Sequence, residues 1–286
     1  MMRIAFSVAF LMASTSGASE PQAVVPPPRP MPPAPPEYSP YRLRLDVDLA
    51  LLIGGTVLWG GTSFIGAGQA PPSWCGTAAT PPCDSNGINA FDRIALGLFD
   101  TKAKQAADAL AGIVPGALTI MDVVDAGITH WRGWLVDAVV ITEAVVWDGA
   151  VQDIVRRATR RPRPYMYTPG LNPSGREGPE ADFSFFSGHT SGTFAMATAT
   201  AYTYSLRHPG SKWQYLVWTL ALAGATTEPI LRVLAGDHFP TDCIVGALVG
   251  TASGILFPAL HRRKLPVRLV SAMTPDQATV GVAGRW

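Results

Sequence analysis

The chain has few charged residues and few cysteines, and its charges almost cancel. Charged residues make up 15% of the 286 residues, against about 25% in an ordinary soluble domain. Three cysteines are too few for a small domain held together by disulfides. A net charge of +1 does not support a nucleic-acid binder, which usually carries a strong basic excess. A hydrophobic content of 48% and a mean hydropathy of +0.19 exclude a disordered chain, so a globular protein or a membrane protein remains.

The first residues have the order of an export signal. Arg3 provides a short basic region, residues 4–12 are apolar, and small residues lead to a plausible cleavage region at Ala18 and Ser19. The apolar stretch is too short to span a bilayer comfortably, and this order is typical of a secretory signal. We therefore predict a signal peptide over residues 1–19, with an uncleaved anchor as the alternative.

Residues 20–41 are rich in proline, with the run PPPRPMPPAPP. This composition cannot build a core and favours an extended polyproline linker. A spacer is the favoured interpretation, and an SH3-type ligand is the functional alternative.

The cysteines fit an exported chain, because export leads to an oxidising compartment. Cys75 and Cys83 lie in one loop rich in glycine, proline and threonine, and we predict a disulfide between them. Cys243 lies inside an apolar run and is expected to be a packed thiol.

The domain at residues 42–264 is predicted to be all-α. Its apolar stretches have helical length, and no sustained two-residue alternation competes with them. We expect a bundle of six helices at about 47–66, 106–124, 133–151, 190–206, 213–231 and 241–260.

Three other features of the chain lie outside this helical pattern. Pro115 should kink the second helix or delay its start, and residues 67–100 should be irregular. The tail at residues 265–286 is expected to form a short β-hairpin with Pro275 in its turn.

Three short segments hold an unusual share of the polar and basic residues. The first is RRATRRPRP at residues 156–164, which alone indicates a solvated loop or a membrane flank. The second is Phe186–His189, where Ser-Gly before a helix start offers either an anion site or a simple N-cap. The third contains His238 and Asp242. In a helix this spacing lets the carboxylate reach the imidazole, although a helix-capping pair has the same spacing.

Taken together, the segments predict a site for a tetrahedral oxyanion. Arginine guanidinium groups match phosphate oxygens in a bidentate manner. A histidine held by a carboxylate can act as a nucleophile, and a second histidine can protonate the leaving oxygen. His130, His208 and His261 lie outside these segments and are expected at the surface or at an interface.

In order and spacing the segments resemble the signature of the type 2 phosphatidic acid phosphatase and vanadium haloperoxidase superfamily, KxxxxxxRP, PSGH and SRxxxxxHxxxD. The three parts stand here as Arg156-x6-Arg163-Pro164, Phe186-Ser187-Gly188-His189 and Leu231-Arg232-x5-His238-x3-Asp242. Three positions depart from the signature, with Arg156 for lysine, Phe186 for proline and Leu231 for serine.

The resemblance implies a six-helix bundle, in some members transmembrane, that hydrolyses phosphate esters. By this analogy the phosphate is bound by Arg156, Arg163, Ser187, Gly188 and Arg232. His238 would attack phosphorus to form a phosphohistidine, Asp242 would orient His238, and His189 would protonate the leaving group. Neither a metal nor another cofactor is expected, since fixed guanidinium groups can neutralise the phosphoryl charge.

The substrate is expected to be a lipid or small-molecule phosphoester, and several alternatives stay open. The chain could be a soluble periplasmic acid phosphatase, a vanadate-dependent haloperoxidase, or a non-catalytic envelope protein that retains the fold. An inner-membrane enzyme with a periplasmic site agrees with the positive-inside rule. Asp137, Glu143 and Asp148 in the third expected helix argue against a membrane location, because carboxylates are costly in lipid.

Overall fold

The computed structural model describes residues 10–11, 39–65, 75, 82–171, 180–263, 267–274 and 277–284. The chain divides into two units, one from Tyr38 to His261 and one made of residues 1–37 and 262–286. The rest of the predicted signal peptide and the predicted linker up to residue 38 lie outside the described residues.

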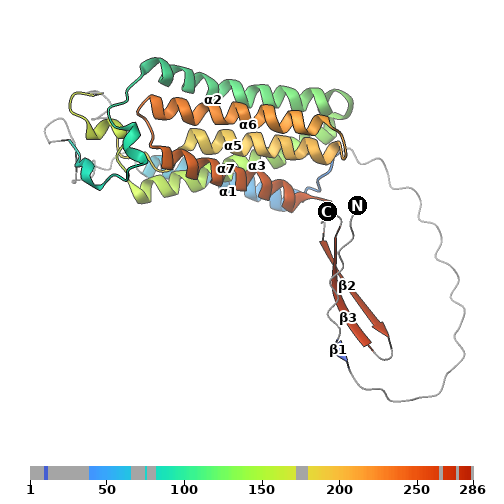
Figure 1. The fold of residues 1–286 in the computed structure, drawn as a ribbon. Coiled ribbons are helices and arrows are strands. Elements are labelled where there is room, and N and C mark those ends of the chain that lie inside the picture. Colours follow the sequence, from blue (N-terminus) through green and yellow to red (C-terminus); the bar gives the residue numbers. More distant parts are fainter. Residues whose placement is uncertain are drawn as a thin grey trace, which may run out of the picture. The chain divides into compact units, whose positions relative to one another are not determined.

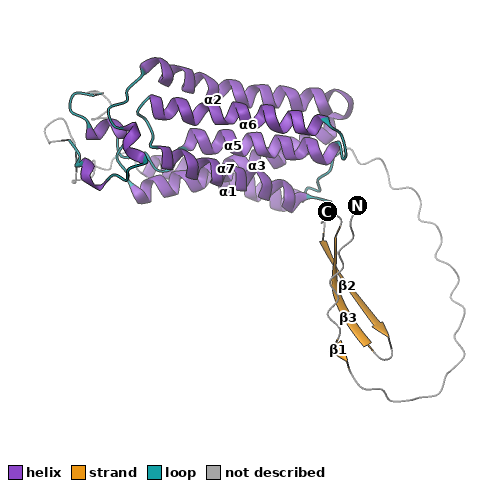
Figure 2. Cartoon of the chain, in the orientation of Figure 1, coloured by secondary structure: helices purple, strands orange, loops and turns teal. Residues whose placement is uncertain are grey.

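The first unit is a bundle of long helices that run side by side (Figure 1, Figure 2). Within the described residues these helices are α1 Leu45–Ile65, α2 Thr101–Asp122, α3 Ile128–Thr159, α5 Gly188–Arg207, α6 Trp213–Leu234 and α7 Pro240–His261. Helix α5 contacts α2, α3, α6 and α7, and α1 packs on α3. The predicted all-α bundle of six helices is confirmed.

Helix α2 begins at a capping residue and contains a proline in its interior. Its N-cap residue Asp100 accepts hydrogen bonds from the backbone N–H groups of Lys102 and Ala103 at 2.8 and 3.1 Å, which stabilises the first turn. The helix begins well before Pro115 and continues through it. Pro115 therefore does not delay the start, and the alternative of a kink at Pro115 stays a prediction. A π-helix at Val123–Gly127 then leads into α3.

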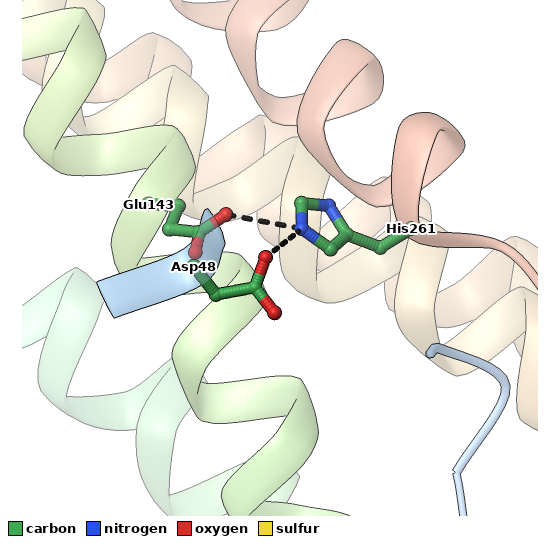
Figure 3. Close-up of side chains that lie close together, drawn as sticks. All are labelled: Asp48, Glu143 and His261. Carbon is green, nitrogen blue, oxygen red and sulfur yellow. Dashed lines mark hydrogen bonds and ion pairs between the residues drawn. The ribbon is translucent and has the colours of Figure 1, made fainter. Parts of the chain in front are cut away.

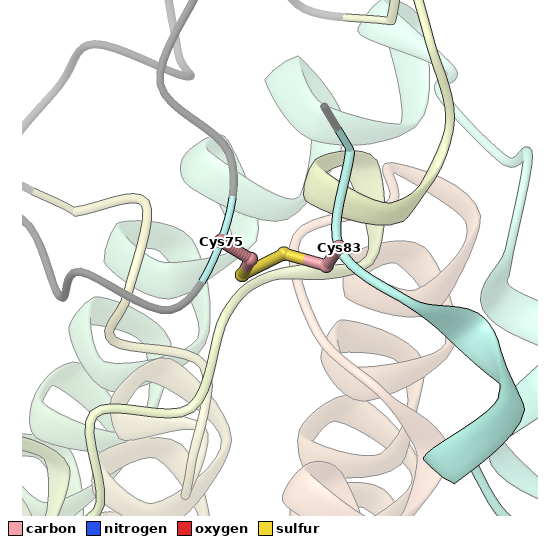
Figure 4. The surroundings of a disulfide bond; sticks show 2 residues. All are labelled: Cys75 and Cys83. Carbon is pink, nitrogen blue, oxygen red and sulfur yellow. A yellow bond between two sulfur atoms is a disulfide. The ribbon is translucent and has the colours of Figure 1, made fainter. Parts of the chain in front are cut away.

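The described part of the segment expected to be irregular, residues 82–100, contains two 3-10 turns, Ser85–Gly87 and Asp92–Ala95. It lies at the same end of the bundle as the segment between α3 and α5 (Figure 1). The predicted disulfide between Cys75 and Cys83 is present, with a Cα–Cα distance of 4.8 Å (Figure 4). The Cys83 N–H donates to the Met166 carbonyl at 3.1 Å, which ties this loop to the 3-10 turn Pro164–Tyr167. Cys243 is buried, as predicted.

The contact between α5 and α7 is unusually close. Helix α7 presents glycines at a four-residue spacing, Gly246, Gly250 and Gly254, to α5. A Cβ at Gly250 would overlap the Ser191 carbonyl, and one at Gly246 would lie 2.7 Å from the Ser187 carbonyl oxygen. Small residues at this spacing allow two helix backbones to approach each other. The glycine stripe thus sets the distance between the first turns of α5 and α7.

The bundle has small and polar residues inside and large apolar residues outside. The interior side chains of α5 are almost all alanine, serine or threonine. Large apolar side chains are exposed along α1, α2, α6 and α7, among them Ile53, Val57, Ile113, Ile120, Leu220, Leu248 and Leu256. Among the residues that the structure describes, two stretches, Thr101–Ala126 and Pro240–His261, are long and apolar enough to cross a membrane.

The second unit contains a small antiparallel sheet. Strands β2 Val267–Thr274 and β3 Gln277–Gly284 pair along their whole length, and the short strand β1 Phe10–Leu11 pairs with β3. The strand order is β1-β3-β2. The expected turn at Pro275 lies outside the described residues. Strand β1 belongs to the segment predicted as a signal, and the signal stays a prediction.

Replacing Gly250 with alanine should separate α5 from α7, because the added methyl group would overlap the Ser191 carbonyl. Overpacking of this kind costs about 1–3 kcal/mol, so we expect the melting temperature of the purified protein to fall by several degrees. Gly112 on α2 has open space around it, and Gly112→Ala should leave the melting temperature unchanged or raise it. Equal melting temperatures for both variants would contradict the close α5–α7 contact.

Candidate active site

A cavity of about 300 Å³ lies where α3 ends and α5 begins. Its lining includes the predicted site residues Arg156, Arg163, Gly188, His189 and His238. The structure therefore brings residues from all three sequence segments to one place. The other predicted residues, Ser187, Arg232 and Asp242, are buried behind this lining.

The hydrogen bond of the His238 ring defines its tautomer. Nδ1 lies 2.7 Å from the backbone carbonyl oxygen of Ser184. Because a carbonyl can only accept, Nδ1 carries the proton and Nε2 carries the lone pair. Burial, together with the nearby Arg163 guanidinium, lowers the pKa of His238 well below its usual value. The ring is therefore neutral at neutral pH, as a nucleophile requires.

Asp242 does not make the hydrogen bond that the sequence suggested. Its Oδ2 is 3.9 Å from His238 Nδ1, and the ring donates to Ser184 instead. Helix α7 begins at Pro240, so His238 precedes the helix and the i, i+4 geometry does not apply to it. The expected direct hydrogen bond between Asp242 and His238 is therefore replaced by one from His238 to Ser184.

Asp242 holds the backbone around His238. Its carboxylate accepts hydrogen bonds from the Ser184 hydroxyl at 2.5 Å and from the Phe239 N–H at 2.9 Å. Its own carbonyl accepts from the Ser187 N–H at 3.1 Å. Asp242 thus fixes the segments on both sides of the imidazole, and it positions the ring through the main chain.

Arg161 joins this arrangement to the loop between α1 and α2, and sequence reasoning missed it. One end of its guanidinium donates to Asp242 at 2.5 Å and the other to Asp92 at 2.7 Å, while the group lies 4.1 Å from the centre of the Phe239 ring. Burial would raise the pKa of Asp92, but the hydrogen bonds from Arg161 and Thr241 outweigh it and lower the pKa. The basic run gave no signal that separates Arg161 from its neighbours.

Arg156 and Arg163, the two arginines of the first segment that were predicted to bind phosphate, share a carboxylate. Glu180 Oε2 lies 3.2 Å from Arg156 Nη1 and 3.3 Å from Arg163 Nη2. Arg156 also contacts Asp153 at 2.5 Å, and Arg163 contacts Asp237 at 3.4 Å. The Glu180 side chain is 52% exposed. A carboxylate therefore occupies donors that the resemblance assigns to phosphate.

Arg232 is buried next to the cavity and does not line it. Its side chain is only 2% exposed and contacts Glu228 at 2.7 Å, Asp108 at 2.9 Å and Asp237 at 3.5 Å. Asp237 also binds Lys104 at 2.6 Å. The residue fastens α2 and α6 to the loop that carries His238, and its predicted contact with phosphate stays a prediction.

The start of α5 provides the remaining donors. Ser187 is the N-cap residue, and its hydroxyl oxygen accepts from the Thr190 N–H at 3.5 Å and from the Thr190 hydroxyl at 3.0 Å. The side chain is thus engaged in the cap. Gly188 lines the cavity, and a Cβ there would lie 2.9 Å from Gln152 Cδ. The first N–H groups of a helix lack intrahelical partners, which makes this end suitable for an anion.

The cavity continues into an apolar part between α1, α3 and α5. Trp59, Val145, Gly149 and Gly192 line it there, beside the polar side chains of Asp148 and Gln152. Trp59 covers Gly149 so closely that a Cβ at this position would lie 2.6 Å from the indole ring. One cavity therefore combines a cationic end with an apolar end.

A search of protein-family models matches residues 137–266 to the PAP2 superfamily. This part of the chain belongs to the PAP2 superfamily. The PAP2 region begins within α3, extends through α7, and includes every catalytic and phosphate-binding residue predicted from the sequence. Helices α1 and α2 lie outside the match, although Trp59, Lys104 and Asp108 contribute to the cavity or to the charges around it.

Two solved structures resemble the chain. One is described as the first transmembrane PAP2 type phosphatidylglycerolphosphate phosphatase from Bacillus subtilis, with 17% identity over 74% of this chain and 94% of that chain and a TM-score of 0.46. The other is LpxE from Aquifex aeolicus, with 21% identity over 58% of this chain and 90% of that chain and a TM-score of 0.41. A search of curated proteins finds no matching relative.

Replacing Glu180 with glutamine should strengthen anion binding in the PAP2 region, because it removes the negative charge that Arg156 and Arg163 share. We expect the inhibition constant of inorganic phosphate or vanadate to fall several-fold, which corresponds to about 1 kcal/mol. Asp46→Asn removes an exposed charge from the Arg44–Asp46 pair and serves as the control. Weaker anion inhibition in Glu180→Gln than in the control would show that Glu180 does not compete with the anion.

Proposed function

We propose that the protein is a phosphatase that hydrolyses a phosphate monoester or a pyrophosphate, in particular that of a lipid, through a phosphohistidine. The observation that carries this proposal is the state of His238. Its Nδ1 donates to a carbonyl, so a neutral Nε2 is available in a cavity that Arg156, Arg163 and His189 also line.

The reaction follows from these groups. The phosphate binds between the guanidinium groups and the start of α5, and Nε2 of His238 attacks phosphorus in line with the leaving oxygen. A nitrogen–phosphorus bond forms and the bond from phosphorus to the ester oxygen breaks. His189, which takes up a proton when the phosphate dianion binds beside it, gives that proton to the ester oxygen. His189 then takes a proton from water, which attacks the phosphohistidine and releases inorganic phosphate. Fixed cations stabilise the charge on the phosphoryl oxygens in both steps.

The buried ion pairs support this mechanism by fixing the cations in advance. Arg163 and Arg232 both contact Asp237, and Lys104 contacts it as well. Cations held by a network need not reorganise when the substrate arrives. Arg232 would then act on the bound phosphate as a charge behind the wall of the cavity, without touching it.

Two observations support a lipid substrate at a membrane. The cavity has the apolar side chains of Trp59 and Val145 in the same lining as Arg156 and Arg163, which fits an amphipathic phosphate ester. The exposed side chains of α1, α2, α6 and α7 are largely apolar, and extended apolar surface is a mark of membrane or protein contact. We therefore infer that the helices lie in a membrane of the cell envelope.

The disulfide supports an extracytoplasmic site. Cys83 is hydrogen-bonded to Met166, close in sequence to Arg163, so the disulfide and the cavity lie at one end of the bundle. Disulfides persist in oxidising compartments. The end of the protein that carries the site should therefore face away from the cytoplasm.

Replacing His238 with alanine should abolish turnover, with a loss of roughly a thousandfold or more, because the nucleophile is removed. His189→Ala should affect alkyl phosphates much more than an aryl phosphate with a good leaving group, which needs no proton. Release of inorganic phosphate and acid-labile labelling of the protein by ³²P substrate measure the two effects. His208→Gln, whose ring pairs with Asp125 at 2.7 Å, is the control. Full activity in His238→Ala would overturn the proposal.

Membrane integration is tested by fractionation. Because the apolar side chains face outward, we expect the protein to stay in the membrane pellet after a wash in alkaline carbonate and to enter solution only with detergent. Release by carbonate alone would instead identify a soluble or peripheral enzyme and would remove the membrane part of the proposal.

A further inference from the structure

We propose that Asp48, Glu143 and His261 bind one divalent transition-metal ion at the end of α7 opposite to the phosphatase site. The three residues come from α1, α3 and α7, and their side chains point toward one another (Figure 3). Their possible ligand atoms all lie within 4.8 Å of one another. Asp48 and Glu143 are buried, and the His261 side chain is only 10% exposed, so the sequence expectation of a surface or interface histidine is wrong.

The ring of His261 presents a lone pair to the two carboxylates. Its Nδ1 lies 2.7 Å from the Phe257 carbonyl oxygen and must donate to it. Nε2 faces Asp48 Oδ1 at 3.2 Å and Glu143 Oε2 at 3.3 Å. In a neutral ring the lone pair on this nitrogen would repel two ionised carboxylates, so a proton or a metal ion must lie between them. A histidine that donates its other N–H to a backbone carbonyl is the usual arrangement of a metal ligand.

Glu143 is the observation that favours a metal ion over a second proton on the ring. It is fully buried, and neither of its oxygens accepts a hydrogen bond from the described residues. One imidazolium would leave two buried carboxylates with a net negative charge, which is costly. The distances of 3.2 and 3.3 Å are also longer than the roughly 2.7–2.9 Å of a charge-assisted hydrogen bond.

The same distances suit two ligands of a single ion. Ligand atoms at about 2.0–2.2 Å from a metal stand roughly 3.0–3.5 Å apart in tetrahedral or octahedral geometry. Two carboxylates and one imidazole suit Zn²⁺, Mn²⁺ or Fe²⁺. Asp48 and His261 also line a cavity of about 460 Å³ with Arg42 and Arg44, which gives an ion access. Asp48 Oδ2 accepts from the Arg44 N–H at 2.6 Å, and this bond fixes the orientation of the carboxylate.

The role of this ion would be to link α1, α3 and α7. Glu143 lies roughly 20 Å along α3 from Arg156, at about 1.5 Å per residue, so the ion takes no part in phosphoryl transfer. The inference therefore stands apart from the proposed phosphatase activity, and its failure would leave that activity untouched.

The test uses the purified full-length protein, carried on a tag without histidines and dialysed against EDTA. After addition of Zn²⁺ or Mn²⁺ and removal of free ion, elemental analysis should find about one bound ion per chain, and the melting temperature should rise by several degrees. Glu143→Gln and His261→Gln should lose at least nine-tenths of the bound metal. Asp125→Asn, which changes the His208–Asp125 pair, should retain it.

Two results would overturn the proposal. One is a wild-type protein that binds no metal and whose melting temperature responds neither to EDTA nor to added ion, which would assign the cluster to a protonated His261. The other is undiminished binding in Glu143→Gln. If both cluster variants fail to fold, the wild type decides alone, through its metal content and the reversal of the EDTA effect by Zn²⁺.

Discussion

The distance between α5 and α7 is the constraint on which the site depends. The proposed proton donor His189 lies in the first turn of α5, and the proposed nucleophile His238 lies just before α7. The Ser187 N–H and the Asp242 carbonyl connect the two helix starts at 3.1 Å. Gly246 and Gly250 make this approach possible, since a Cβ at either would meet the α5 backbone. Because catalysis tolerates little displacement of reacting groups, a feature of the helix interface governs the chemistry at its end.

Around this contact, buried charged side chains form ion-pair networks. Asp242 and Asp92 are bridged by Arg161, and Asp237 is shared by Lys104, Arg163 and Arg232. A buried charge is costly unless it is paired and hydrogen-bonded, so these networks allow several arginines to stand close together beside the cavity. They also explain why Asp242 positions His238 through the main chain and not by a direct hydrogen bond. Its oxygens are needed by Arg161, Ser184 and the Phe239 N–H.

The sequence predicted the helices and the main site residues for different reasons. The helices follow from long apolar stretches, and Arg163, His189 and His238 follow from a motif whose spacing the fold preserves. The contact between Asp92 and Arg161 could not be predicted from the sequence, because the two residues are 69 positions apart and no local pattern marks the contact. The spacing of His238 and Asp242 suggested a contact within a helix, but the helix begins at Pro240. Because His238 stands before that helix, its ring donates to the Ser184 carbonyl instead.

The carboxylates of α3 illustrate how a structure can reverse an argument from composition. Asp137, Glu143 and Asp148 argued against a membrane location because charges are costly in lipid. All three are buried in the bundle. Asp137 accepts from the Ser39 hydroxyl at 2.7 Å and pairs with Arg207, while Glu143 faces His261. The surface that a bilayer would meet is apolar instead, with Ile53, Val57 and Leu248 among its exposed side chains. The charges therefore belong to the interior that holds the helices together, and they no longer oppose a place in the membrane.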